Sequence, residues 1–385
     1  MRPRKEITAE IVVELLVNSA LVAKLLAEYQ DAESRLDRAL ELAEKTGQAE
    51  MVQKALSEKA GLYYQWGRLD EGLALAELVI SSGNKESNGY KAGALNTAGN
   101  IHLRRCEFNS AEKCFRQALD YFRQLNMEIS LGTATNNLAN IHNIQGNYPQ
   151  ALELYRQALE CFERQNDIFR TAHVLYSLGQ IVLALKDTAQ AKALLNRSLA
   201  LRQVVQDYRG ITNNLLMQIG ILTDERDFKG ARELLRQADQ VMNERKLTDP
   251  HLRAYRDGEA GLFHFEAGEY DLAEECLLRL IELSQKMKES SFLSRGYSCL
   301  GRTRVFRDGT EAGIADIKKG IKLAQDGDLP LELKDGWAYI TECYCRLGQM
   351  EPARQAAQHF ARLALEQGNS REMVDAEIAR LLSGK

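Results

Sequence analysis

The chain is poor in proline, in tryptophan and in long uninterrupted apolar segments. Only five prolines and two tryptophans occur among 385 residues. Alanine, leucine, glutamate, glutamine and arginine recur throughout, and these side chains lose little freedom when they enter a helix. Proline, which interrupts helices, is nearly absent. The composition therefore predicts a soluble, folded chain built mainly from helices.

Cysteine is too sparse and too scattered to provide a disulfide framework. The seven cysteines are odd in number and spread from Cys106 to Cys345, whereas disulfide-stapled domains are short and carry even, dense sets. We interpret them as reduced thiols of a cytoplasmic protein, most of them buried. Cys343 and Cys345 are two positions apart and would point to different sides of a helix, so no metal site is expected there.

The sequence also lacks a strong charge of one sign and the common catalytic motifs. The formal net charge is −4, without the basic excess typical of nucleic-acid-binding proteins. There is no glycine-rich phosphate loop, no H-E-x-x-H, no paired C-x-x-C and no G-x-S-x-G. We therefore predict a protein that is not an enzyme and that binds no cofactor, metal or nucleic acid.

One apolar stretch near the N-terminus needs a separate interpretation. Residues 11–26 are mostly apolar and follow Arg2, Arg4 and Lys5, an order that resembles a signal peptide. Glu14 and Lys24 interrupt the stretch, which is also short for a membrane span. We expect it to form a helix buried on one side, and we predict neither export nor membrane binding.

A pattern recurs along the whole chain at intervals close to 40 residues. It consists of an aromatic or apolar residue followed three positions later by a small one, as in Tyr148 and Ala151. Units 8 and 9 match the pattern less well; in unit 8, Thr310 replaces the aromatic residue and Gly313 the alanine. The first residues of the nine units are Tyr29, Leu69, Phe108, Tyr148, Thr188, Phe228, Tyr270, Thr310 and Met350.

Each unit has the pattern of two helices joined by a short turn. Glycines such as Gly146 mark the turns, and glycine or asparagine, as at Asn166 and Gly83, marks the ends of second helices. Small residues recur in the first helix, for example Gly179, and larger ones such as Leu195 in the second. We predict that the small residues allow the two helices to approach closely and that the larger side chains fill the space beside them.

These motifs resemble the tetratricopeptide repeat: a small residue in the first helix, a G-x-[YF]-x-x-A turn, and an alanine seven positions later, as in Ala158. The usual unit of that family has about 34 residues, and the longer unit here resembles those of kinesin light chains, cell-polarity adaptors and bacterial peptide-sensing regulators. The resemblance implies an all-α fold, a right-handed superhelical α-solenoid of about nine helix pairs. We expect it to span residues 1–370, with a capping helix at 371–385.

The resemblance also implies that first helices line a concave groove. Asparagines are frequent at the corresponding positions, and an amide can both donate to and accept from a peptide backbone. The same amides could instead be solvated or could fix the stacking of repeats. The predicted groove residues are Asn96, Asn100, Arg104, Asn136, Asn140, Asn143, Tyr176, Gln180 and Arg302.

The function that this resemblance implies is protein binding. We predict a cytoplasmic adaptor or scaffold that binds an extended or helical segment of another protein in its groove. One alternative is a regulatory sensor of a short signalling peptide, and another is a self-assembling structural scaffold. The apolar residues of 11–26 are the candidate surface for a homodimer.

Overall fold

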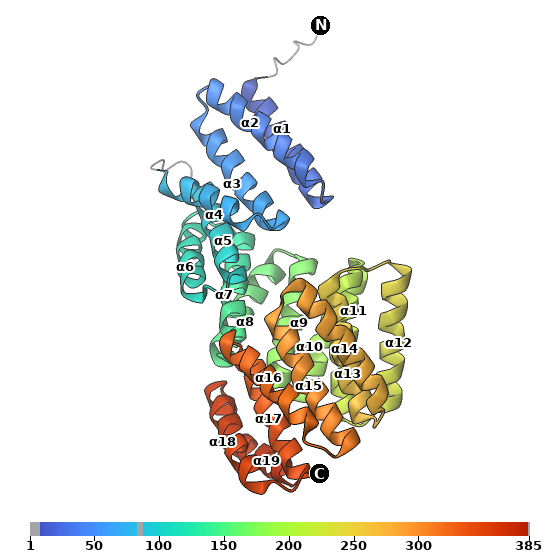
Figure 1. Ribbon diagram of the computed structural model, residues 1–385. Helices are drawn as coiled ribbons and strands as arrows, with labels where there is room; N and C mark the ends of the chain where they lie inside the picture. Colours follow the sequence, from blue (N-terminus) through green and yellow to red (C-terminus); the bar gives the residue numbers. More distant parts are fainter. Residues whose placement is uncertain (1–7, 83–87, 384–385) are drawn as a thin grey trace. The chain divides into compact units, whose positions relative to one another are not determined.

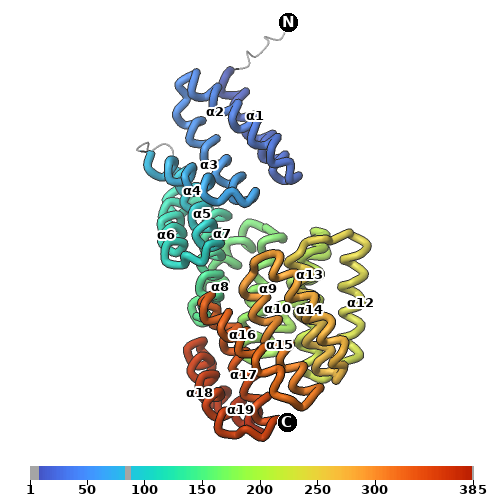
Figure 2. The backbone as a smooth tube through the Cα atoms, in the orientation of Figure 1, coloured from blue at the N-terminus to red at the C-terminus, as the bar shows by residue number. Residues whose placement is uncertain are grey.

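The computed structural model of the protein describes residues 8–82 and 88–383; Arg2, Arg4, Lys5 and Gly83 lie outside these ranges. All regular secondary structure in the described ranges is helical (Figures 1 and 2). The helices are α1 (Ala9–Leu25), α2 (Tyr29–Lys45), α3 (Ala49–Trp66), α4 (Leu69–Ser81), α5 (Asn88–Arg104), α6 (Phe108–Gln124), α7 (Glu128–Ile144), α8 (Tyr148–Arg164), α9 (Ile168–Ala184), α10 (Thr188–Val204), α11 (Tyr208–Asp224), α12 (Phe228–Glu244), α13 (Pro250–Glu266), α14 (Tyr270–Met287), α15 (Ser290–Asp308), α16 (Ala312–Asp326), α17 (Pro330–Arg346), α18 (Met350–Glu366) and α19 (Arg371–Leu382).

The helices form successive pairs, so the predicted all-α repeat solenoid is confirmed. In most pairs the second helix begins at the first residue of the repeated pattern, as α8 does at Tyr148. The pair of α15 and α16 differs, because α16 begins at Ala312 rather than at Thr310. Helix α19 follows the last pair and contacts α17 and α18, where Val374 and Leu381 are buried.

The turns between helices share one hydrogen-bonding pattern. After α9, the Lys186 amide donates to the Leu183 carbonyl at 2.9 Å and the Asp187 amide donates to the Val182 carbonyl at 3.1 Å. These bonds satisfy the last carbonyls of the helix and require a left-handed residue, here Lys186 at φ 68°. Glycine occupies the same position in other turns, for example Gly146 at φ 73°.

The chain divides into two compact units, Met1–Ile141 and His142–Lys385. In the first unit, one apolar core packs α1 to α3 together around Val13, Val17 and Leu62. In the second unit, buried leucine, isoleucine and phenylalanine side chains such as Phe263 and Ile317 continue from pair to pair.

Small residues allow the helices of a pair to approach closely, as predicted. A Cβ placed on Gly179 of α9 would lie 3.0 Å from Leu195 of α10, and one placed on Gly261 of α13 would lie 2.8 Å from Leu277 of α14. The larger side chain of the second helix thus occupies the space that the glycine leaves.

Candidate ligand cavity of the second unit

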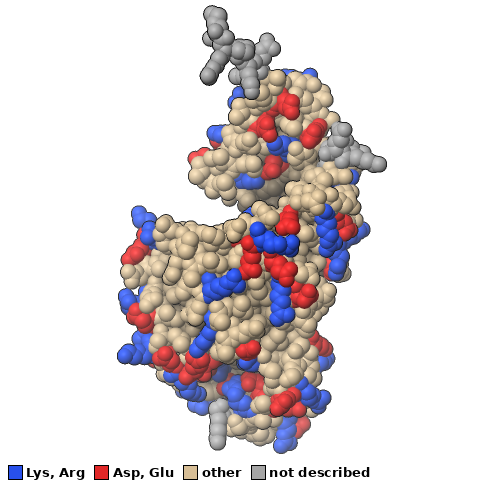
Figure 3. All heavy atoms as spheres, turned by 180° about the vertical axis from the view of Figure 1, so that it is seen from behind, with Lys and Arg blue, Asp and Glu red and all other residues tan. Residues whose placement is uncertain are grey.

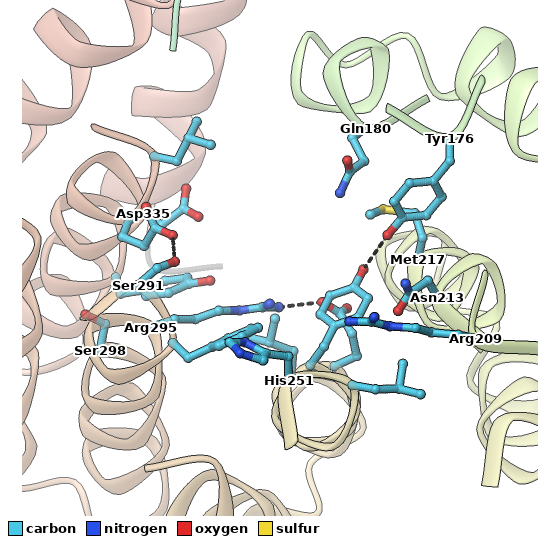
Figure 4. A pocket seen from close by; sticks show the side chains of 18 residues that line it. Tyr176, Gln180, Arg209, Asn213, Met217, His251, Ser291, Arg295, Ser298 and Asp335 are labelled. Atoms are coloured by element: carbon cyan, nitrogen blue, oxygen red, sulfur yellow. Dashed lines mark hydrogen bonds and ion pairs between the residues drawn. The ribbon is translucent and has the colours of Figure 1, made fainter. Parts of the chain in front are cut away.

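The first helices of five successive pairs enclose a cavity of about 530 Å³ (Figure 4). Every lining residue lies on α9, α11, α13, α15 or α17. Most lining residues of a helix are three or four positions apart, as Arg209, Asn213 and Met217 are on α11, so they share one helix face. The volume lies within the range of ligand-binding pockets.

One side of the cavity presents phenol and amide groups. Tyr176 and Gln180 of α9 lie opposite α15 and α17 in Figure 4. The Tyr176 hydroxyl lies 3.5 Å from the Tyr255 hydroxyl of α13. Burial raises the pKa of Tyr176 to about 12, so its hydroxyl keeps its proton at neutral pH. Together with Asn213 of α11, these groups can donate or accept hydrogen bonds without adding charge.

Two arginines of the cavity already have acidic partners. Arg295 of α15 forms an ion pair with Glu259 of α13 at 2.6 Å. Arg209 of α11 forms one with Asp249, the residue before α13, at 3.1 Å. Each pair links neighbouring first helices, and their charges largely cancel.

Glu332 and Asp335 of α17, which we call the acidic wall, have no such compensation. They are three positions apart and both line the cavity. Glu332 accepts a hydrogen bond from the Ser291 hydroxyl of α15, but neither carboxylate forms an ion pair within the described part of the chain. Burial raises the pKa of Glu332, and the charge of Asp335 adds to this shift, whereas hydrogen bonds from Ser291 and from the backbone and the charge of Arg295 oppose it. The cavity therefore carries excess negative charge at this wall.

Glu332 is expected to reduce the stability of the ligand-free protein. Its pKa in the folded state lies above the ordinary value of 4.5, which applies in the unfolded chain. At a pH between the two pKa values, the folded state therefore holds a proton that the unfolded chain has released. The stability contributed by this group falls as pH rises through that window. Glu332→Gln should therefore be more stable than wild type at pH 7, and the difference should shrink as pH falls to 4.5. Urea unfolding at both pH values measures this, with Glu372→Gln on the exposed side of α19 as the control. Equal stabilities at pH 7 would contradict it.

The predicted site residues occupy several different environments. Tyr176 and Gln180 line the cavity. Asn143, near the end of α7, hydrogen-bonds the buried Tyr155 side chain instead. Its contact with a ligand therefore stays a prediction.

In the first unit, the asparagines of α5 and α7 contact one another. The Asn137 amide of α7 donates to the side-chain oxygens of Asn96 at 3.3 Å and Asn100 at 3.0 Å, both on α5. This arrangement joins two neighbouring first helices, which is the stacking role considered above. Asn136 is only 9% exposed, and Asn140 is half-buried. Ligand binding by Asn96, Asn100, Asn136 and Asn140 stays a prediction.

The two predicted arginines also contact neighbouring pairs. The exposed Arg104 of α5 donates to the Tyr64 carbonyl of α3 at 3.3 Å. Arg302 of α15 is only 7% exposed and forms ion pairs with Glu342 of α17 at 2.7 Å and Glu266 of α13 at 3.0 Å. Its guanidinium lies outside the cavity lining and connects three successive first helices.

The sequence-based prediction did not include most of the cavity, namely the lining residues of α11, those of α13 other than Leu262, and the acidic wall of α17. The prediction assumed that groove residues stand at the same distance from the small residue in every first helix. In the structure this distance changes along the chain. The lining residues of α9 lie in its second half, whereas those of α17 lie between its first turn and Tyr339. The helical spacing of His251, Tyr255 and Glu259 was the available signal.

Comparisons with known proteins agree with this fold. Residues 130–203 match the family described as tetratricopeptide repeat. No curated protein matches the chain significantly. The match identifies residues 130–203 as tetratricopeptide repeats, and the helix pairs before and after them have the same kind of fold. The chain is thus an all-α solenoid of helix pairs that contains tetratricopeptide repeats at residues 130–203.

Solved structures share this fold over nearly the whole chain. A Rap protein complexed with the competence and sporulation factor has a TM-score of 0.70 at 13% identity, covering 97% of this chain and 100% of that chain. The apo form of the quorum sensor NprR from B. thuringiensis has a TM-score of 0.60 at 13% identity, covering 94% and 100%. NprR in complex with its cognate peptide NprX has a TM-score of 0.59 at 12% identity, covering 96% and 97%.

The described residues contain neither a candidate membrane span nor a candidate metal site. No helix there combines the length and the apolar character that crossing a membrane requires. No cluster of three or more histidine, cysteine, aspartate or glutamate side chains in the same ranges is arranged to hold a metal ion. On the face shown in Figure 3, basic and acidic side chains are interspersed.

Proposed function

We propose that the cavity between α9 and α17 binds a short peptide segment that carries a basic group, and that the protein acts through this binding without catalysis. The observation that carries the proposal is the acidic wall, two carboxylates without an ion-pair partner in a cavity whose two arginines pair with other carboxylates. A lysine, arginine or free amino terminus of the ligand would supply the missing charge.

The rest of the cavity suits a peptide backbone. Gln180 and Asn213 can bond main-chain amides and carbonyls, and Met217, Leu252 and Phe292 can contact apolar side chains. The volume of about 530 Å³ favours a short segment over a long helix. The ligand would be either a segment of a partner protein, held by an adaptor, or a signalling peptide detected by a regulator.

The comparisons support peptide binding. Two of the proteins with this fold are complexes, one with the competence and sporulation factor and one with the peptide NprX. For this chain we propose a cytoplasmic role with a peptide or protein partner, rather than a nucleic acid or a membrane.

The charge of the acidic wall can be tested with peptides selected on the protein itself. A displayed library of random heptapeptides would be selected against the full chain, and the enriched peptides would be synthesised. We expect enrichment of lysine or arginine. Glu332→Gln combined with Asp335→Asn should weaken binding by roughly 10- to 100-fold, because the loss of one charge-assisted hydrogen bond to the ligand costs about 1.5–3 kcal/mol.

A matched control is available on α19. Glu372 and Asp375 have the same residue types and spacing but are exposed on the outside of the helix. Glu372→Gln combined with Asp375→Asn makes the same charge change and should leave binding unchanged by isothermal titration calorimetry. Equal losses in the two double variants, or enrichment of acidic peptides, would count against the proposal.

We also propose that the first unit self-associates through the outer face of α1. Ile11, Leu15, Val22 and Leu25 of α1 and Leu26 directly after it are 43–80% exposed, which is an unusual concentration of exposed apolar side chains for one helix. Sedimentation velocity over a concentration series should show a dimer that Leu15→Glu abolishes. Leu78→Glu on α4, where a single leucine is 54% exposed, should not change it. A wild-type chain that stays monomeric at high micromolar concentration excludes the proposal.

A further inference from the structure

The two ends of the second unit touch each other. Stacked repeats normally contact only their neighbours. Here the turn between α7 and α8 meets the turn between α18 and α19, more than 200 residues later in the sequence (Figure 1). A Cβ placed on Gly146 would lie 2.7 Å from Cγ of Gln367, and one placed on Gly368 would lie 3.1 Å from the Pro149 ring.

Two of the turn glycines differ from the others because they take part in this contact. Gly146 and Gly368 share their left-handed conformation with five more glycines in the described turns. A Cβ at any of those five would meet nothing within 4 Å. The open positions are Gly47, Gly67, Gly268, Gly309 and Gly348. Close approach is therefore a property of this contact and not of the turn itself.

Gln367 is at the centre of the contact. It is only 2% exposed, and its Nε2 donates to the carbonyl of Pro330, the first residue of α17, at 2.9 Å. One side chain thus joins the end of α18, the start of α17 and the turn before α8. Tyr148, the first residue of α8, is buried beside it, and burial raises its pKa, with Asp335 and Glu332 of the acidic wall adding to the shift. The contact lies next to the cavity.

We propose that Gly146, Pro149, Pro330, Gln367 and Gly368 form a clasp that fixes the distance between the two end walls of the cavity. Helix α8 leads directly into α9, which carries Tyr176 and Gln180, and α17 carries the acidic wall. If each helix pair contacted only its neighbours, small changes in the angle between successive pairs would add up across the five first helices and would change the distance between α9 and α17. The clasp removes this freedom because it connects the turn before α8, which leads into α9, to the start of α17. An effect of the clasp on ligand binding rests on the proposed function, whereas the presence of the clasp does not depend on that function.

The clasp can be tested without a ligand. Ketone-bearing amino acids would replace the exposed Arg156 on α8 and Arg354 on α18 and would carry nitroxide labels, leaving the seven native cysteines unmodified. Double electron–electron resonance on the full chain measures the separation of the labels. We expect one narrow distance distribution in otherwise wild-type protein, and a longer, broader one after Gln367→Ala, which removes the bond to Pro330.

A pair of glycine variants provides the matched control. Gly146→Ala and Gly348→Ala introduce similar backbone strain, at φ 73° and 74°, but only Gly146 faces a neighbouring side chain. We expect Gly146→Ala to shift the distances as Gln367→Ala does and Gly348→Ala to leave them unchanged. A broad wild-type distribution, or unchanged distances in Gln367→Ala, would overturn the clasp. Neither result would bear on whether the cavity binds peptides, which the charge variants of the acidic wall test separately.

Discussion

Replacing Arg302 with alanine is expected to lower the free energy of unfolding by about 3–5 kcal/mol, because it leaves a buried carboxylate without its partner. Arg302 is 7% exposed and Glu342 is 8% exposed, and their two hydrogen bonds measure 2.7 and 3.0 Å. The guanidinium also lies 4.0 Å from the ring centre of Phe265. The substitution thus removes two ion pairs, the cation–π contact with Phe265 and the connection between α13, α15 and α17.

Urea unfolding measures this change, and two further variants define its cause. Arg236→Ala removes an exposed arginine that pairs with Glu233 within α12, and it should lower the free energy of unfolding far less than Arg302→Ala does, because exposed ion pairs contribute little. Arg302→Met combined with Glu342→Leu removes both charges and should recover much of the lost stability. A loss below about 1 kcal/mol for Arg302→Ala would show that the buried pair does not hold the repeats together.

The second large effect is expected at Gly313, where two helix backbones touch. A Cβ at Gly313 of α16 would lie 2.1 Å from the Gly301 carbonyl oxygen of α15, and a Cβ at Gly301 would lie 2.3 Å from the Gly313 carbonyl oxygen. Backbone atoms cannot rotate away as a flexible side chain can, so the pair of helices must separate. Gly313→Ala should therefore lower the free energy of unfolding by about 3 kcal/mol, at the upper end of overpacking effects.

Gly61 provides the matched control for this substitution. It also lies inside a helix, α3, but a Cβ there would meet only the end of the Lys24 side chain, at 3.9 Å. Gly61→Ala should raise stability by about 0.5–1 kcal/mol, because alanine loses less conformational freedom in a helix than glycine. Thermal or urea unfolding compares the two variants. If Gly313→Ala is also stabilised, α15 and α16 are not in backbone contact.

The repeated pattern predicted the fold because the same local packing recurs in each pair. A residue such as Tyr148 begins its helix in the structure, as the pattern indicates. Thr310 does not, since α16 begins later, at Ala312. The turns were predicted where glycine or asparagine is present. Lys186 and Arg226 adopt the same left-handed conformation without any local sequence signal, because the hydrogen bonds of the turn offset their strain.

The candidate site was harder to predict than the fold. Tyr176 and Gln180 were found because α9 exposes toward the cavity the positions that the family resemblance indicates. In later pairs, different positions of the first helix line the cavity. A prediction that uses the same positions in every repeat therefore misses Glu332 and Asp335. Arg302 has the residue type of a ligand-binding group, but its role depends on Glu342, 40 residues away in sequence. Such pairing is a property of the stacked helices and is not visible in a single repeat.

The account depends on the ligand lying in the cavity of the second unit, and photo-cross-linking tests this location directly. A selected peptide would be irradiated with full-length protein carrying p-benzoylphenylalanine at Gln180 in the cavity, at Asn96 among the asparagines of α5, or at the exposed Gln157 of α8. The account predicts a cross-linked peptide from position 180 and none from positions 96 or 157. Cross-linking from position 96 with none from position 180 would contradict it.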